Sequence, residues 1–318
     1  MFDMHLDLLT LAYMAKRQNK YPELQKMLDN ITWGKVFGIG ANLYFMSPDE
    51  MGHKLKYPSN INVLLMFKEA VHTLESFNFK INLLYSIEGC DYIQDERELE
   101  ALYQAGLDAI ILTWNTPNKY GSGNRSTQGL TALGRTFIQK AIDLGLAIDL
   151  SHANEATFKG IIDEIAKAQR QHKDVICYAS HSNIRSLYDH PRNLNDEQLK
   201  LLKSVGGYLG LVAYPPFLTN QTSVNSLKKA YIDHIIYAAN LFGVDHIFLA
   251  SDNMEWLKSF DETDTSASPL FSYNVQVDEI NKLLSFHFKP EDIQKIMHGN
   301  ANKIYAHVKS KKNSNVPR

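Results

Sequence analysis

The feature that most constrains the fold is a regular alternation along the chain between short apolar runs rich in branched residues and stretches with helical periodicity. The apolar runs start roughly 27 to 45 residues apart, which is the length of a strand, a loop and a helix in one βα unit. Eight such units predict a parallel sheet closed into a (β/α)8 barrel. The predicted strands are residues 2–8, 36–45, 81–88, 108–114, 146–151, 174–180, 207–214 and 246–252.

An open, doubly wound sheet is the alternative for such a pattern. A dinucleotide-binding sheet of that kind needs a Gly-rich loop after its first strand, but Leu8-Leu9-Thr10-Leu11-Ala12 stands there. We therefore expect one barrel domain over residues 1–308 and, at 309–318, a disordered basic tail. Helices are expected at residues 62–74, 129–144, 195–204 (with Asn195 as N-cap), 224–242 and 276–287, with additional helices at 16–34 and 290–307.

Composition excludes several classes of protein. The 33 basic and 35 acidic side chains nearly cancel, which gives no electrostatic reason to expect nucleic acid or an anionic membrane as a partner. No apolar run approaches the ~18 residues that span a bilayer, and the amino terminus lacks the basic-then-apolar pattern of a secretory signal. Two cysteines, Cys90 and Cys177, cannot form a disulfide scaffold or a Cys-type zinc site. We expect a cytoplasmic protein.

Polar side chains stand where the predicted strands end. Because the loops after the strands line the open mouth of a barrel, these side chains should converge on one rim. Neutral imidazoles and carboxylates are ligands that Zn²⁺ and similar ions accept. The strand ends read Asp3-Met4-His5-Leu6-Asp7, Ser86-Ile87-Glu88, Asp149-Leu150-Ser151-His152, Ala179-Ser180-His181 and Ala250-Ser251-Asp252.

The charges at this rim fit two metal ions. Two divalent ions carry four positive charges, which Asp7, Glu88, Asp252 and one hydroxide would balance. A metal pair ~3.5 to 4 Å apart needs a bridging carboxylate, and Glu88 is well placed to supply it. Any one of these residues alone is more often structural, so the hypothesis rests on their coincidence at several strand ends. Other histidines, among them His234 within a helical pattern, are predicted to be structural.

With these motifs the sequence resembles the renal (membrane) dipeptidase family, metallopeptidases with a (β/α)8 barrel. The resemblance covers nearly the whole chain, and its most specific part runs from Ser180 to Leu194. Its other anchors are Asp3–Asp7, Glu88-Gly89, Leu112–Asn115 with Asn118, Asp149–His152, Ser251-Asp252 and Gly299-Asn300-Ala301.

The resemblance implies a zinc-dependent dipeptidase whose metal-bridging hydroxide attacks the peptide bond. His5 and Asp7 would bind one zinc, His152 and His181 the other, and Glu88 would bridge both. In the same way, Asp3 is expected to orient a ligand imidazole. The family also implies a homodimer.

Two further roles follow from the resemblance. Arg192 would grip the C-terminal carboxylate of a dipeptide, because a guanidinium donates two parallel hydrogen bonds. Asp252 would carry a proton to the leaving amine.

The sequence departs from the family pattern at two places. Trp114 stands where the family often has a histidine, and an indole cannot carry a proton, so we expect a bulky wall of the pocket there. Asp252-Asn253-Met254-Glu255 replaces the usual second Asp and Gly, which alters a loop at the mouth. Two alternatives therefore stay open: a related barrel hydrolase acting on another amide, a lactone or a phosphoester, and a catalytically silent relative that binds a peptide-like ligand.

Overall fold

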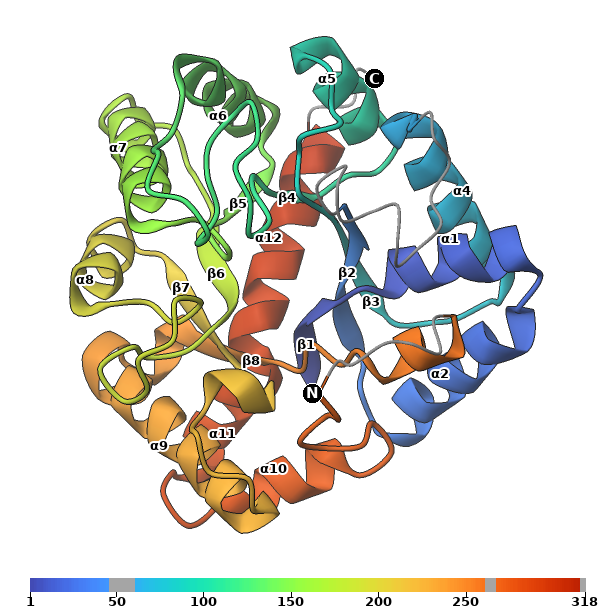
Figure 1. Cartoon of the computed structure of the whole chain (residues 1–318), viewed down its shortest axis with the longest axis vertical. Coiled ribbons are helices and arrows are strands. Elements are labelled where there is room, and N and C mark those ends of the chain that lie inside the picture. The colour runs from blue at the N-terminus through green and yellow to red at the C-terminus, as the bar shows by residue number, and fades with distance from the viewer. Residues whose placement is uncertain (46–60, 261–266, 315–318) are drawn as a thin grey trace.

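The fold is a closed barrel of eight parallel strands surrounded by helices (Figure 1). The structure is a computed structural model that describes residues 1–45, 61–260 and 267–314. The strands pair in sequence order around the barrel, so the predicted (β/α)8 architecture and all eight predicted strands are confirmed. They are β1 (Phe2–Leu6), β2 (Gly38–Tyr44), β3 (Asn82–Glu88), β4 (Ala109–Ile111), β5 (Ala147–Asp149), β6 (Cys177–Ser182), β7 (Tyr208–Val212) and β8 (Ile247–Ala250).

Helices follow the strands and cover the outside of the barrel. Several begin at the side-chain caps that their sequences favour, and Asn195 forms the predicted N-cap as part of a capping box with Gln198. The helices are α1 (Leu8–Gln18), α2 (Tyr21–Trp33), α4 (Val63–Ser76), α5 (Glu96–Gln104), α6 (Ala132–Leu144), α7 (Glu155–Arg170), α8 (Asp196–Ser204), α9 (Val224–Phe242), α10 (Gln276–Leu284), α11 (Pro290–Gln294) and α12 (Asn300–Ser314). Among the described residues, no helix combines the length and apolarity needed to cross a membrane.

The chain after β1 differs from expectation. A single helix was predicted at 16–34, but α1 starts directly after β1, and α2 follows a break at Asn19, which adopts a left-handed conformation (φ 54°). Every residue from Leu8 to Ala15 is buried, so the first turns of α1 have no polar face and show no amphipathic period. The predicted helix at 290–307 is likewise divided, by a π-helical turn at Lys295–Gly299.

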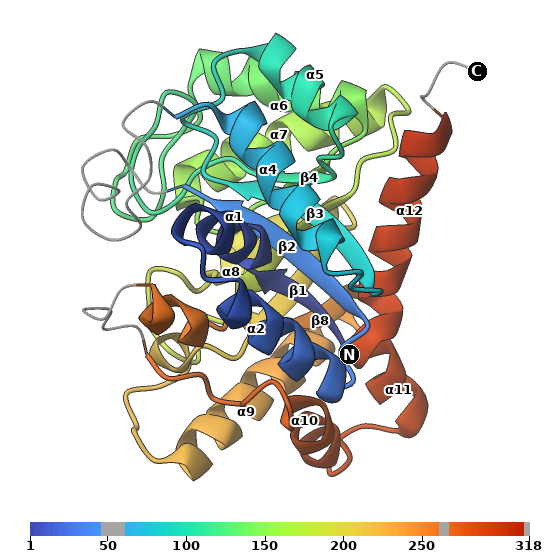
Figure 2. The same ribbon diagram turned by 90° about the vertical axis from the view of Figure 1, so that its right-hand side faces the viewer.

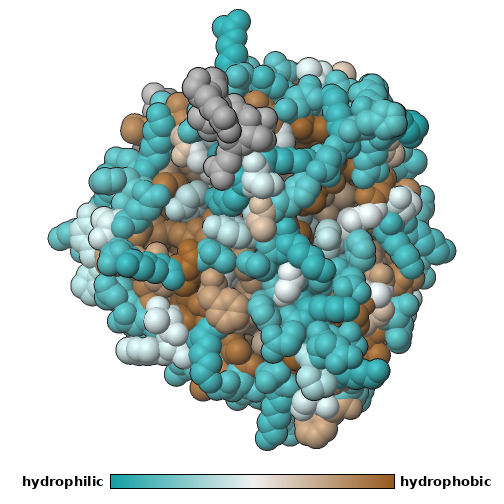
Figure 3. All heavy atoms as spheres, turned by 180° about the vertical axis from the view of Figure 1, so that it is seen from behind, coloured by the Kyte–Doolittle hydropathy of each residue, from teal (hydrophilic) through white to brown (hydrophobic). Residues whose placement is uncertain are grey.

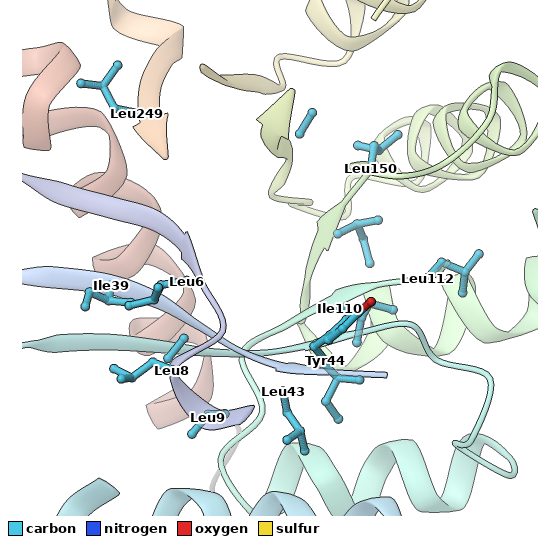
Figure 4. Packing of buried hydrophobic residues seen from close by; sticks show 14 of the residues in the cluster. Leu6, Leu8, Leu9, Ile39, Leu43, Tyr44, Ile110, Leu112, Leu150 and Leu249 are labelled. Atoms are coloured by element: carbon cyan, nitrogen blue, oxygen red, sulfur yellow. The ribbon is translucent and has the colours of Figure 1, made fainter. Parts of the chain in front are cut away.

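The core fills the space between the strands and the surrounding helices. Parallel strands are buried on both faces, which explains their nearly continuous apolar runs. Figure 4 shows this packing for side chains such as Leu6 and Ile39 on the strands and Leu8 and Leu9 on α1. A second apolar cluster joins strand residues to α12; it comprises Phe2, Met4, Leu84, Ala109, Ala147, Tyr178, Phe248, Ala301, Ile304 and Val308.

α12 closes the end of the barrel at which the strands begin. In Figure 2 it runs along one side of the molecule, next to the amino terminus, and Tyr305 packs against Phe2 with ring centroids 6.0 Å apart. Figure 3 looks at this side of the molecule and shows mainly hydrophilic residues with hydrophobic ones scattered between them. A functional site is expected at the opposite end of the barrel, where the strands finish, because the loops that follow the strands lie there.

The predicted disordered tail from Lys309 is wrong as far as Ser314, because α12 continues through these residues. Asp108 at the start of β4 is fully buried, and Lys309 and Lys312 both contact its carboxylate, Lys312 at 3.1 Å. A buried carboxylate needs such partners, and the i, i+3 spacing places both lysines on one face of the helix. Residues 315–318 lie outside the described residues.

His234 on α9 is structural, as predicted. Its Nδ1 accepts a hydrogen bond from the backbone N–H of Ile184 (3.2 Å), and its Nε2 lies 3.2 Å from the carbonyl oxygen of Leu218. Burial lowers the pKa of His234 to about 4. The imidazole thus ties α9 to the loops after β6 and β7 in its neutral form.

This burial predicts a pH-dependent stability. The unfolded chain takes up a proton at the imidazole below pH ~6.5, whereas the folded chain resists protonation until about pH 4. The free energy of unfolding should therefore be fully retained above pH ~6.5 and fall by up to about 3 kcal/mol toward pH 4. Urea unfolding of His234→Gln should show a shallower decline over this window, while the exposed-site control His287→Gln should follow the wild type. Equal slopes for wild type and His234→Gln would contradict this assignment.

Candidate metal centre and substrate pocket

A cavity of ≈ 260 Å³ opens at the end of the barrel where the strands finish. It collects side chains from far-apart parts of the chain, as the sequence predicted. Its lining residues are Asp7, Tyr44, Glu88, Trp114, Asn115, Arg125, His152, Arg192, Tyr214, Phe217, Asp252, Met254, Trp256 and Leu257.

Glu88, the last residue of β3, lies at the centre of the predicted ligands. One carboxylate oxygen is 3.2 Å from Nε2 of His5, and the other is 2.6 Å from Nε2 of His152 and 3.8 Å from Nε2 of His181. The Nε2 atoms of His152 and His181 are themselves only 2.8 Å apart. One oxygen of Glu88 thus faces His5 and the other faces His152 and His181, so this carboxylate could bridge two metal ions.

Asp7 completes the group that contains His5 and Glu88. It stands at the N-cap position of α1, yet its side chain makes no capping hydrogen bond. Its Oδ1 is buried and has no hydrogen-bond partner among the described residues. A buried carboxylate oxygen without a partner is costly, and a cation at this point would relieve that cost. One ligand atom from each of His5, Asp7 and Glu88 falls within 4.8 Å of the others, and the same holds for Glu88, His152 and His181.

The pKa shifts of the side chains at this site reflect their burial and the negative charge of the neighbouring carboxylates. Burial, together with the nearby Glu88 carboxylate, raises the pKa of Asp7 well above its usual range. Burial disfavours a charged His5, but the carboxylates of Glu88, Asp252 and Asp7 outweigh this effect and raise its pKa to about 10. Burial and Arg192 lower the pKa of His152 to about 3. His152 is therefore neutral, whereas His5 would give up its proton to a divalent ion, which accepts neutral imidazoles and carboxylates as ligands.

The other ring nitrogen of each histidine is held by a neighbouring side chain. Nδ1 of His152 lies 2.8 Å from Oδ1 of Asn115, and Nδ1 of His181 lies 2.7 Å from Oγ of Ser180. Nδ1 of His5 lies 3.0 Å from Nδ2 of Asn42. These contacts fix the rings so that all three Nε2 atoms face Glu88.

Among the described residues no imidazole contacts the Asp3 carboxylate, which meets His5 only through the backbone N–H of that residue (3.3 Å), so the expectation that Asp3 orients an imidazole is wrong. Its carboxylate accepts hydrogen bonds from the hydroxyls of Ser251 and Tyr273 (both 2.5 Å) and from the backbone N–H of Ser251 (2.9 Å). The pairing of β1 with β2 shifts register between Asp3 and Leu6, so strict alternation along β1 does not hold. Asp3 instead fixes the residue that precedes Asp252.

Two of the predicted site residues adopt left-handed backbone conformations, which non-glycine residues rarely do. His152 has φ 68° and Asp252 has φ 47°. The backbone N–H of Asp252 donates to the carbonyl oxygen of His5 (3.2 Å), and its Oδ1 lies 3.8 Å from Nε2 of His5. Such conformations cost roughly 1 to 3 kcal/mol each and cluster at functional sites.

Arg192 and Trp114 both line the cavity. Arg192 is buried, with its guanidinium 5.4 Å from the ring centre of Phe217, and it contacts the carbonyl oxygen of His181 at 3.5 Å. Trp114 packs between Tyr44 and His152, with centroid distances of 5.5 and 6.1 Å, and so forms a wall of the cavity. Met254, in the altered segment after β8, also lines the cavity.

Asp149 also lies near His5 and His181. Its Oδ1 accepts backbone hydrogen bonds from Ser151 (2.9 Å) and Ser180 (3.0 Å). It thus ties the end of β5 to β6, which explains its burial without a metal. Glu88 and Asp7 are the better candidates for ligands.

A closed barrel with imidazoles and carboxylates converging at its strand ends is typical of metal-dependent barrel hydrolases. Within this class, the chain belongs to the membrane dipeptidase family (peptidase family M19), whose family model matches residues 53–317.

Individual relatives agree with this assignment. The chain is 33% identical over 177 residues to an uncharacterized protein in the pqqA 5′ region of Klebsiella pneumoniae. This match covers 52% of the chain and 62% of the relative. The chain is 26% identical to the dipeptidase aclJ of Aspergillus oryzae, over 72% of the chain and 52% of the relative. The chain spans about half the length of the curated relatives it matches.

Solved structures share the fold. The crystal structure of dipeptidase AC, a metallopeptidase of family M19, superposes with a TM-score of 0.72 at 18% identity, over 96% of this chain and 98% of that one. A metallopeptidase from Rhodobacter sphaeroides, liganded with a phosphinate mimic of the dipeptide L-Ala-D-Ala, gives a TM-score of 0.66 at 17% identity, over 88% and 89% of the two chains.

Proposed function

We propose that this protein is a metal-dependent dipeptidase that holds two divalent ions, zinc by preference, at the mouth of its barrel. The observation that carries the proposal is the placement of Glu88, whose two carboxylate oxygens face His5 and His152 separately. Oδ1 of Asp7 supports it, because this buried atom has no hydrogen-bond partner among the described residues and a cation would satisfy it. Homodimer formation and cytoplasmic residence stay predictions from the sequence.

The residues divide between two positions. His5 and Asp7 would hold one ion, His152 and His181 the other, and Glu88 both. When bound, such a pair supplies a hydroxide nucleophile at neutral pH and polarises the scissile carbonyl. The nitrogen and carboxylate donors favour zinc among the common divalent ions.

The remaining chemistry belongs to side chains of the pocket. Arg192 would bind the free carboxylate of a dipeptide through two parallel hydrogen bonds, and the ring of Phe217, whose centre lies 5.4 Å from Cζ, supports the guanidinium. Burial raises the pKa of Asp252, so its carboxyl group can hold a proton and give it to the leaving amine. Trp114 would exclude water on the side of His152.

The contact between Asn115 and His152 predicts an effect on metal affinity. Asn115→Ala should weaken binding at the position of His152 and His181 about 10- to 100-fold, because the imidazole loses the group that fixes its ring. Competition with a chromophoric chelator measures this affinity, and Asn220→Ala at an exposed site serves as the control. Unchanged affinity in Asn115→Ala would show that the ring is held by other means.

A turnover screen tests the proposed function. Purified protein, with its metal content determined on the same sample, is offered dipeptides of mixed chirality, lactones and phosphotriesters. Dipeptide hydrolysis that disappears after chelation and returns with zinc or manganese supports the proposal. Turnover of lactones or phosphotriesters alone would identify another barrel hydrolase, and thermal stabilisation by dipeptides without turnover would identify a silent relative.

A further inference from the structure

The segment after β8 builds part of the cavity wall with three large, mainly apolar side chains. Met254, Trp256 and Leu257 all line the cavity, the last two from the short 3-10 helix Glu255–Ser259. Trp256 and Leu257 are buried, with 6% and 4% of their surface exposed, and Met254 is half-buried. Figure 1 shows this segment in orange beside α2. One short segment thus presents a largely apolar surface to the space in which a substrate would lie.

The indole nitrogen of Trp256 is a buried donor. Nε1 has no hydrogen-bond partner among the described residues. An indole nitrogen can only donate, and it usually finds an acceptor when it is buried. Because Trp256 lines the cavity, an oxygen of a bound ligand would satisfy this donor.

The segment is held in place by contacts with its surroundings. The backbone N–H of Glu255 donates to Oδ1 of Asn253 (2.9 Å). The ring of Phe260 lies edge-on to Trp256, with ring centroids 5.9 Å apart. Nζ of Lys20, between α1 and α2, lies 5.1 Å from the ring centre of Phe260. The wall is therefore positioned before a substrate binds, which lowers the entropic cost of binding.

The scissile bond and the C-terminus of a dipeptide are already assigned to other groups of the cavity. The metal positions and Asp252 would act on the scissile bond, and Arg192 would bind the carboxylate. Dipeptides differ from one another in their side chains, and half of the residues that line the cavity are apolar or aromatic. Such a lining favours an apolar side chain, since burying a polar one without a partner is costly.

We propose that Met254, Trp256 and Leu257 form a subsite for a large apolar side chain of the dipeptide, and that the indole N–H of Trp256 donates to a main-chain oxygen of the same molecule. The inference rests on the proposed function and names its substrate class, which is dipeptides with leucine, methionine or an aromatic residue in at least one position. It makes these three residues determinants of specificity.

Matched substrate pairs test the preference for apolar side chains. The values of kcat/KM are compared for dipeptides of alanine with leucine against asparagine and with methionine against glutamine, in both orders and in L,L and L,D forms. Each pair differs in polarity at nearly constant shape. The wild type should favour the apolar member by about tenfold or more in at least one position, which is the discrimination that an apolar pocket can supply.

A substitution of Met254 assigns the preference to this segment. Met254→Gln keeps the length of the side chain but adds an amide, and it should lower the apolar-to-polar ratio by about fivefold. The control Leu65→Gln, at an exposed position on α4 and outside the cavity, should keep the wild-type ratio. Thermal unfolding checks that the variants are folded. Met254→Ala, which removes most of a half-buried side chain, should lower the ratio in the same direction and replaces Met254→Gln if that variant does not fold.

A substitution of Trp256 tests the hydrogen bond to the main chain. Trp256→Phe keeps an aromatic ring without the N–H, and it should raise KM about tenfold for all dipeptides with little change in kcat. The control Trp33→Phe, at an exposed position on α2, should leave KM unchanged. A purely structural role of Trp256 would lower the thermal stability of the variant without this uniform rise in KM.

The outcomes separate this inference from the proposed function. Equal turnover of apolar and polar dipeptides by the wild type in both positions overturns the subsite but leaves the dipeptidase intact. A wild-type ratio that survives in the Met254 variants shows that the side chain binds elsewhere, and an unchanged KM in Trp256→Phe overturns the indole contact. No turnover of any dipeptide overturns the proposed function and the inference together.

Discussion

Replacing Glu88 by glutamine is expected to lower kcat/KM for dipeptides by about 10³-fold or more, because the change removes the charge that both metal positions share. The neutral amide keeps the shape of the side chain but turns one oxygen that faces an imidazole group into an N–H donor. Steady-state kinetics on a dipeptide hydrolysed by the wild type, together with metal analysis of the same sample, measures the effect. At least one of the two ions should be lost or weakly held.

The control for this substitution is Glu100→Gln, which alters an exposed ion pair with Lys140 on the outside of the barrel. It should leave kcat/KM unchanged, since such surface pairs contribute little. Thermal unfolding of both variants shows whether the fold is retained. Activity of Glu88→Gln within tenfold of the wild type, with full metal content, would rule out Glu88 as the bridging ligand.

Arg192→Ala is the second substitution with a large expected effect. It should lower kcat/KM for a dipeptide about 10²-fold, mainly through KM, because the buried guanidinium is assigned to the C-terminal carboxylate. Arg192→Lys should recover only part of the loss, since an ammonium cannot form the bidentate contact.

The matched control for Arg192 is a substrate change. The wild type should hydrolyse a dipeptide much faster than the corresponding dipeptide amide, whose C-terminus carries no charge. Arg192→Ala should lose this discrimination, so that acid and amide are hydrolysed at similar rates. If the acid retains its full advantage in Arg192→Ala, the carboxylate is bound elsewhere in the pocket.

Most of the barrel could be predicted from sequence because each strand is a short apolar run that repeats with the spacing of a βα unit. Prediction failed where a local pattern was hidden or interrupted. The first turns of α1 are buried on all sides and show no helical period. From sequence alone the lysines of α12 indicate a disordered tail, because their partner, Asp108, lies about two hundred residues earlier in the chain.

The candidate ligands could be predicted for a similar reason. His5, Glu88 and His181 lie within or at the ends of strands, and a barrel brings those ends together whatever the loops do. The side chains that hold the imidazole rings could not be predicted from the sequence. The contacts of Asn42 with His5 and of Asn115 with His152 each join positions 37 residues apart. A polar Asn42 inside an otherwise apolar strand was the available signal.

Asp3 and Arg125 show the limit of reading strand ends alone. The partners of Asp3 are Ser251 and Tyr273, which reach it only when the last strand closes the barrel. The place of Arg125 depends on how the loop after β4 folds back onto Asn115. Neither contact corresponds to a periodic pattern of apolar and polar residues in the sequence, so neither could be predicted from such a pattern.

The most direct test of the account is a metal titration of the chelated protein, followed by dipeptide turnover and metal stoichiometry on the same samples. The account predicts that activity is absent without metal and reaches its maximum as two equivalents of zinc are bound. Full dipeptide hydrolysis by protein that retains no divalent ion would contradict it.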